Sequence, residues 1–116
     1  KNSNPSVSCD DTIQSTIFKI SASRLGATAV LDKTGSLAGI ITDGDIRRML
    51  EKGFSLETLK AGDIMSRSPK TIDFSELAYK AFNIMEKNKI TSVVVLDKGS
   101  YKGLVHIHDI IREGIV

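Results

Sequence analysis

Two stretches of this chain repeat one pattern: AVLDKTGSLAGIITDGDIRR at residues 29–48 and VVLDKGSYKGLVHIHDIIR at residues 94–112. They align along their whole length once a single residue is dropped from the turn of the second copy. A repeat of this length is one supersecondary unit. Two copies predict a pseudo-two-fold domain with matching clefts, an arrangement that is more typical of binding than of catalysis.

Each copy predicts a helix, a β-hairpin and a second helix. Apolar residues at helical spacing after polar capping residues predict first helices over about 10–24 and 75–89. Met85 and Phe82 fall on this apolar face, so we interpret them as core. Apolar runs on either side of a glycine-containing turn predict the hairpin strands. These strands span 28–31 and 37–42 in the first copy, and 92–96 and 102–107 in the second.

The second helices and the opening strands complete the α+β pattern. The helix of the first copy begins near Asp43 or Asp45 and ends at Gly53, and its counterpart runs from Asp109 to Gly114. Residues 55–59 predict a helical turn. Short strands are expected at 5–7 and 70–72. The expected order in each copy is therefore β-α-β-β-α.

Composition excludes several classes of protein. The 116 residues carry a net charge of only +2, dispersed along the chain, and 5% aromatic residues, which argues against a nucleic-acid surface. No apolar run has the length of a membrane span, and no signal peptide is visible. The single cysteine, Cys9, allows no internal disulfide and fits a reducing, cytoplasmic location; its acidic neighbours argue against a nucleophilic role. Because the chain starts at Lys1 rather than Met, we expect it to be a piece of a longer protein.

The order of elements and several motifs resemble the CBS domain, a module that works as a tandem pair. Asp63-Ile64-Met65, Pro69 and Thr71-Ile72 resemble the opening of a copy, and GIITDGD at residues 39–45 resembles its close. The resemblance implies two CBS repeats with pseudo-two-fold packing, at 1–54 and 55–116. On this resemblance, we expect the first repeat to be without its opening segment.

Two longer motifs resemble a narrower family, the arabinose 5-phosphate isomerases. They are GIITDGDIRR at residues 39–48 and GLVHIHDIIREGIV at residues 103–116. In that family a sugar isomerase (SIS) domain precedes the CBS pair, and the enzyme supplies the lipopolysaccharide sugar Kdo. The resemblance implies that catalysis lies in the missing domain, so we assign no catalytic residue and no cofactor to this chain.

Candidate ligand-binding residues gather where the first copy passes from strand to helix. A helix start favours an anion, and Gly44 lets a ligand approach the backbone. Thr42 could donate to a phosphate and Asp45 could accept from ribose hydroxyls, the roles that the matching residues have in nucleotide-binding CBS pairs. Asp43 lies between them.

The same residues also fit a purely structural role. Thr42 and Asp45 have the spacing of a capping box, which is worth about 1 kcal/mol of helix stability. The carboxylates of Asp43 and Asp45 would repel a phosphate unless Arg47, Arg48 or a lysine compensates. Both interpretations stay open at this point.

The remaining candidates lie in the second copy and at the start of its opening segment. His106 replaces the usual Ser/Thr, and Asp109 matches Asp45. Together with His108 they suggest a metal site, but zinc needs three or four ligands, so we assign none. Ser66 and Arg67 precede Pro69 in a loop that borders the ligand cleft in CBS pairs. The alternative is a solvated basic loop.

Three functions fit these observations. The first is a regulatory and oligomerisation module of an arabinose-5-phosphate isomerase-like enzyme that binds a nucleotide or nucleotide-sugar effector, such as CMP-Kdo, between its copies. The second is a structural module without a ligand, and the third is a stand-alone nucleotide sensor. Apolar residues on the second helices predict a homodimer through the CBS helices, with a tetramer as an alternative for the parent enzyme.

Overall fold

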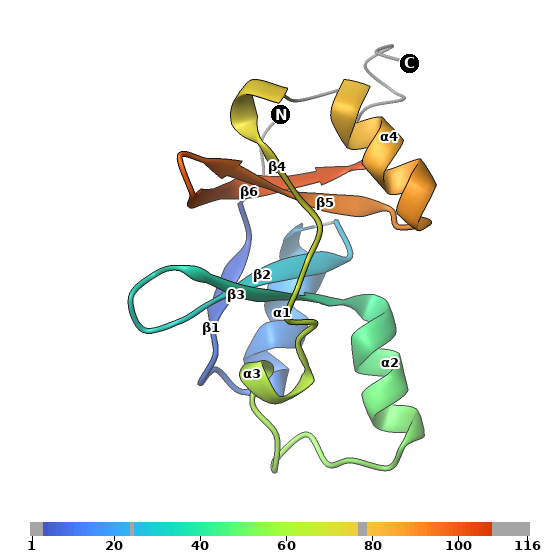
Figure 1. Ribbon diagram of the computed structural model, residues 1–116. Helices are drawn as coiled ribbons and strands as arrows, with labels where there is room; N and C mark the ends of the chain where they lie inside the picture. The colour runs from blue at the N-terminus through green and yellow to red at the C-terminus, as the bar shows by residue number, and fades with distance from the viewer. Residues whose placement is uncertain (1–3, 24, 77–78, 108–116) are drawn as a thin grey trace. The chain divides into compact units, whose positions relative to one another are not determined.

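Two three-stranded sheets, each accompanied by helices, make up the fold (Figure 1). The computed structural model describes residues 4–23, 25–76 and 79–107. Residues 5–68 form one compact unit, and residues 69–116 together with 1–4 form the other. The α+β class and the β-α-β-β order are confirmed in both copies. The predicted boundary of the repeats between residues 54 and 55 stays a prediction, and the predicted helix from Asp109 lies outside the described residues.

The first unit contains the candidate site. Its sheet has the order β1-β2-β3, with β1 parallel to β2 and β2 antiparallel to β3. Its elements are β1 (Ser6–Ser8), α1 (Ile13–Ser23), β2 (Ala27–Leu31), β3 (Leu37–Thr42), α2 (Asp43–Glu51) and α3 (Ala61–Ile64).

Helix α1 begins three residues later than the sequence pattern predicts. The carboxylate of Asp11 accepts a hydrogen bond from the Ser8 backbone N–H, which holds residues 8–11 in a turn. Thr12 then caps the helix, since its hydroxyl oxygen accepts from the Ser15 backbone N–H at 3.0 Å.

The residue missing from the second copy of the repeat is explained by the two hairpin turns. In the first, the Asp32 carboxylate accepts from the backbone N–H groups of Thr34 and Ser36 and closes a longer turn. In the second, Lys98 and Gly99 have φ angles of 52° and 84°. Two consecutive residues with positive φ make the tight turn that suits a two-residue hairpin. Strand β6 therefore starts at Ser100, two residues earlier than predicted.

The segment that opens the second sequence copy packs on the first unit. Ala61 is fully buried and belongs to the same core cluster as Val7, Ile20, Val30 and Ile41. Downstream, Ser66 exchanges two backbone hydrogen bonds with Ile40 of β3, at 2.9 and 3.0 Å. Gly39 makes this approach possible, because a Cβ there would lie 2.5 Å from the Ser66 carbonyl oxygen. This contact brings α3 alongside the end of β3 that leads into α2.

The second unit repeats the same sheet order, β4-β5-β6. Its core confirms that Met85 is buried and that Phe82 packs against the buried cluster. After the last residue of α4, Lys89 has a φ of 57°, which allows the Ile90 N–H to reach the Met85 carbonyl. The elements are β4 (Thr71–Asp73), the 3₁₀ turn η1 (Phe74–Glu76), α4 (Tyr79–Asn88), β5 (Ser92–Asp97) and β6 (Ser100–His106).

Candidate functional site

The predicted capping box at the start of α2 is present. Thr42 adopts an extended backbone, and its hydroxyl oxygen accepts from the Asp45 backbone N–H at 3.3 Å. In return, Oδ2 of Asp45 accepts from the Thr42 backbone N–H at 2.9 Å and lies 3.2 Å from the Thr42 hydroxyl. The structural role of Thr42 and Asp45 is therefore confirmed. Their contact with a ligand stays a prediction.

The other two residues of the predicted site continue the first turn of α2. The Asp43 backbone N–H donates to the Gly26 carbonyl at 3.0 Å, and its side chain is exposed. Gly44 leaves room for an arginine, since a Cβ there would lie 3.2 Å from Nη1 of Arg48. Arg48 in turn donates from Nη2 to Oδ1 of Asp45 at 2.6 Å.

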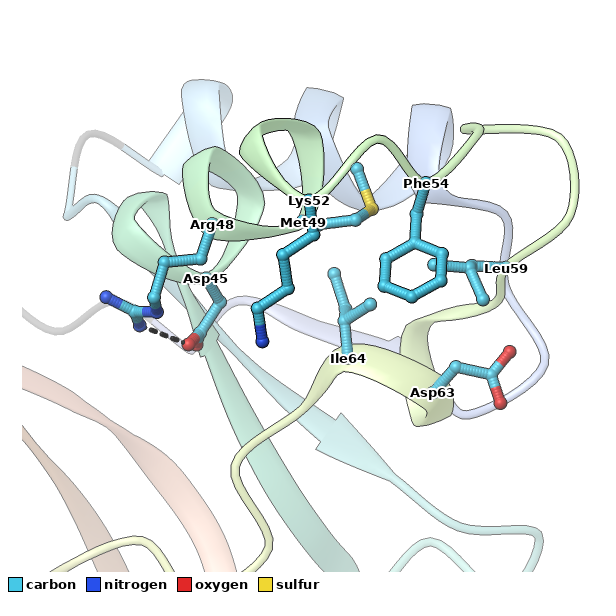
Figure 2. Close-up of a pocket in the computed structure, with 8 residues that line it drawn as sticks. All are labelled: Asp45, Arg48, Met49, Lys52, Phe54, Leu59, Asp63 and Ile64. Atoms are coloured by element: carbon cyan, nitrogen blue, oxygen red, sulfur yellow. Dashed lines mark hydrogen bonds and ion pairs between the residues drawn. The ribbon is translucent and has the colours of Figure 1, made fainter.

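A pocket of about 280 Å³ lies between α2, α3 and the loop that connects them, which we call the α2–α3 pocket (Figure 2). Asp45, Arg48 and Met49 lie on one face of α2, at positions i, i+3 and i+4, and Lys52, the C-cap residue of the helix, continues the row at i+7. The opposite wall comes from the connecting loop and α3. The complete lining is Asp45, Arg48, Met49, Lys52, Phe54, Leu59, Asp63 and Ile64.

Ser66 and Arg67 come shortly after Ile64, the last residue along the chain that lines the α2–α3 pocket, but neither is part of the lining. Ser66 aligns with Ile40, two residues before Thr42 on β3. Because this pairing is antiparallel, residues preceding Ser66 run toward the α2 end of β3, and Arg67 runs away from it. The Arg67 guanidinium is exposed and donates to the Gly62 carbonyl at 3.5 Å.

The candidates of the second copy belong to the other unit. His106 is half-buried at the end of β6 and pairs in register with Ser92. His108 and Asp109 lie outside the described residues. Within the described ranges, no three His, Cys, Asp or Glu side chains converge as metal ligands would.

A second hollow, of about 210 Å³, lies between α1 and α2 on the first unit, and we call it the α1–α2 groove. Leu50 lines it and is 52% exposed, and Phe18 of α1 is 74% exposed. Ile17, Ile20, Ser21, Asp43, Ile46 and Arg47 form the rest of its lining.

The sequence predicts the end of the α2–α3 pocket where Asp45 lies, but not the end formed by the connecting loop and α3. The helical spacing of Arg48, Met49 and Lys52 from Asp45 was available as a signal. Phe54, Leu59, Asp63 and Ile64 become neighbours of α2 only because residues 60–66 return to β3. No local pattern carries that information.

The fold defines the chain as a tandem of two β-α-β-β modules with a capped, pocket-lining helix after the first hairpin. The CBS domain family model matches residues 2–52 and again residues 61–115. The chain therefore belongs to the CBS-domain family and carries two copies of the domain.

The chain is also similar to individual relatives and to a solved structure. Over 97% of its length, the chain is 37% identical to the arabinose 5-phosphate isomerase KdsD of Yersinia pestis and 36% identical to that of Pseudomonas aeruginosa. It spans only 34% and 35% of those relatives. A CBS domain protein from Pyrobaculum aerophilum, solved in complex with AMP, has a TM-score of 0.86 at 22% identity, over 97% of this chain and 92% of that one. That likeness establishes the fold.

Proposed function

We propose that this chain is the regulatory and oligomerisation module of an arabinose-5-phosphate isomerase-like enzyme and binds a nucleotide or nucleotide-sugar effector. CMP-Kdo, the activated end product of the pathway that such an enzyme would feed, is the effector we favour. The similar proteins of Yersinia pestis and Pseudomonas aeruginosa carry the isomerase name, while this chain spans about a third of their length. The activity would reside in the remainder, in a sugar isomerase domain of the cytoplasm, and this chain alone would have none.

The observation that carries the binding function is the α2–α3 pocket. It combines an apolar floor with charged groups at its rim, as small-molecule sites do. Asp45 offers a carboxylate to ribose hydroxyls, and two cations offer partners for a phosphate. The AMP complex of a protein with the same fold supports a nucleotide as the class of ligand.

Thermal unfolding in the presence of candidate ligands tests this function. A ligand that binds the native state raises the melting temperature, by mass action, to an extent set by its concentration relative to Kd. AMP, CMP and CMP-Kdo form the panel, with ribose 5-phosphate and inorganic phosphate as controls for the charge alone. We expect at least one nucleotide to raise the melting temperature where phosphate does not. If no member of the panel does so at millimolar concentration, the effector function is wrong.

A second candidate, a purely structural dimerisation module, is favoured by the α1–α2 groove. Leu50 lines this groove and Phe18 belongs to α1, one of its two helices; both expose large apolar side chains, which are typical of interaction surfaces. We propose that a second copy of the chain covers this face, making a homodimer that could double to a tetramer in the parent enzyme.

Light scattering distinguishes the dimer from a monomer. Wild type should have the mass of two chains, and Leu50→Glu should approach the mass of one. Phe74→Glu is the matched control, because Phe74 is a 42% exposed aromatic residue of the other unit. If the wild type is a monomer at micromolar concentration, the proposed homodimer is wrong.

The length of the native open reading frame distinguishes a regulatory module of a larger enzyme from a stand-alone nucleotide sensor. We expect an open reading frame that encodes a sugar isomerase domain upstream of Lys1. A gene that encodes a CBS pair alone would favour the sensor.

Within the described part of the chain, no helix is long and apolar enough to cross a membrane.

A further inference from the structure

The capping box already uses the groups that sequence reasoning assigned to a phosphate. The Thr42 hydroxyl accepts from the Asp45 backbone N–H and lies 3.2 Å from Oδ2 of Asp45, to which it donates. A hydroxyl has a single proton to donate. Thr42 therefore has no donor left for a ligand as long as the cap is intact, and the phosphate needs another partner.

Arg48 is the best placed of the nearby donors. Its guanidinium reaches back over the start of α2 to bind Oδ1 of Asp45, the carboxylate oxygen that the cap does not use. The Arg48 side chain is 59% exposed, whereas that of Asp45 is 11% exposed. The arginine thus lies at one end of the α2–α3 pocket, beside Asp45, and its side chain is accessible to solvent (Figure 2).

Lys52 extends the cationic wall by one helical turn. In Figure 2 its amine points into the α2–α3 pocket, below α2. In the described part of the chain this amine takes part in no ion pair, whereas Arg48 is paired. Beyond the two cations, Met49 and Ile64 with the ring of Phe54 supply an apolar floor. The carboxylate of Asp63 lies at the opposite end of the lining from Arg48 (Figure 2), so an anion is favoured only at the Arg48 end.

We propose that Arg48 is the anion-binding, specificity-determining residue of the α2–α3 pocket. A phosphate monoester displaces Oδ1 of Asp45 from the guanidinium, and the freed oxygen accepts from a ligand hydroxyl. The ligand class is a ribose-like diol that carries a phosphate and an apolar or aromatic ring, as in a nucleoside monophosphate. A guanidinium can bind a phosphate through two parallel hydrogen bonds, whereas the structure gives one hydrogen bond from Arg48 to Asp45, so the exchange can add a hydrogen bond.

Gly44 supports the same arrangement. A Cβ at this position would lie 3.2 and 3.5 Å from the two terminal nitrogens of Arg48 and 3.5 Å from the Thr42 hydroxyl oxygen. The nearest heavy atoms around Gly44 are thus those of the arginine and the cap. The missing side chain leaves the guanidinium room to lie over the first turn of α2.

The test compares each nucleotide with its nucleoside on three proteins by titration calorimetry. The ligands are AMP against adenosine and CMP against cytidine, and the proteins are wild type, Arg48→Ala and Arg47→Ala. Arg47 is the matched control, since it neighbours Arg48 on α2 but lines the α1–α2 groove. We expect Arg48→Ala to weaken the nucleotide at least about tenfold, the usual effect of losing a charge-assisted hydrogen bond. Affinity for the nucleoside should stay within about twofold, and Arg47→Ala should leave both unchanged.

Since this inference rests on the proposed function, the outcomes separate the two. A wild type that binds no nucleotide overturns the effector function and the role of Arg48 with it. A wild type that binds a nucleotide only as tightly as Arg48→Ala does overturns the role of Arg48 alone. Equal losses in Arg47→Ala and Arg48→Ala would indicate a diffuse charge effect and also overturn it. Weaker binding of nucleoside and nucleotide alike in Arg48→Ala would show a structural role instead.

Discussion

Replacing Gly39 by alanine should destabilise the first unit by about 2–3 kcal/mol. The new Cβ would lie 2.5 Å from the Ser66 carbonyl oxygen and 2.9 Å from the sulfur of Met65, so residues 65 and 66 must move away from β3. That movement breaks the two backbone hydrogen bonds between Ile40 and Ser66, each worth about 1 kcal/mol. Moving Met65 away from the buried cluster that it packs against should cost about as much as the loss of one of these hydrogen bonds.

Gly44→Ala is the matched control for this prediction. Its Cβ would meet the end of the flexible Arg48 side chain rather than backbone. In exchange, alanine in a helix gains about 0.5–1 kcal/mol over glycine, so this variant should be neutral or more stable. Urea denaturation followed by circular dichroism measures both variants. Equal stability of Gly39→Ala and Gly44→Ala would refute the packing of residues 65 and 66 on β3.

Three further predictions concern the cap, the interface and pH. Asp45→Ala should lose about 1 kcal/mol of capping energy and should also weaken nucleotide binding more than His106→Ala does; a lower melting temperature with unchanged affinity would show that Asp45 is only a cap. Phe18→Ser should weaken the dimer measured by light scattering without lowering the melting temperature of the monomer, because Phe18 is 74% exposed. The hydrogen bonds that the carboxylate of Asp32 accepts, first from the Thr34 side chain, hold its pKa below the usual 3.8. Asp32→Ala should therefore lower stability at neutral pH, and urea denaturation at several pH values should show the difference from wild type vanishing as the pH falls below 3.8 through the lowered pKa.

Short-range features of the fold could be predicted from the sequence. Apolar runs on either side of a glycine-containing turn predict both hairpins, and the spacing of Thr42 and Asp45 predicts the cap of α2. These features depend on residues at most a few positions apart. The predicted start of α1 is wrong by three residues. The Asp11 carboxylate accepts from the Ser8 backbone N–H, which precedes it, and Thr12 caps the helix instead.

Contacts between distant segments could not be predicted in the same way. The burial of Ala61 in the core of the first unit and the pairing of Ser66 with Ile40 depend on how residues 60–66 return to β3. The α2–α3 pocket depends on that return, so its α3 side was missed even though Asp45, one of the predicted residues, lines it. Our proposal also gives the phosphate a different partner from the one that the sequence predicts. The Thr42 hydroxyl donates within the capping box, so we assign the phosphate to Arg48.

Titration of the wild-type chain with AMP and CMP tests the central claim, that the α2–α3 pocket binds a nucleotide, most directly. We predict a saturable heat of binding for at least one of them, with an affinity at least about tenfold weaker in Arg48→Ala and retained in Arg47→Ala. Absence of a saturable heat for either nucleotide in the wild type, together with an unchanged melting temperature, would contradict the account.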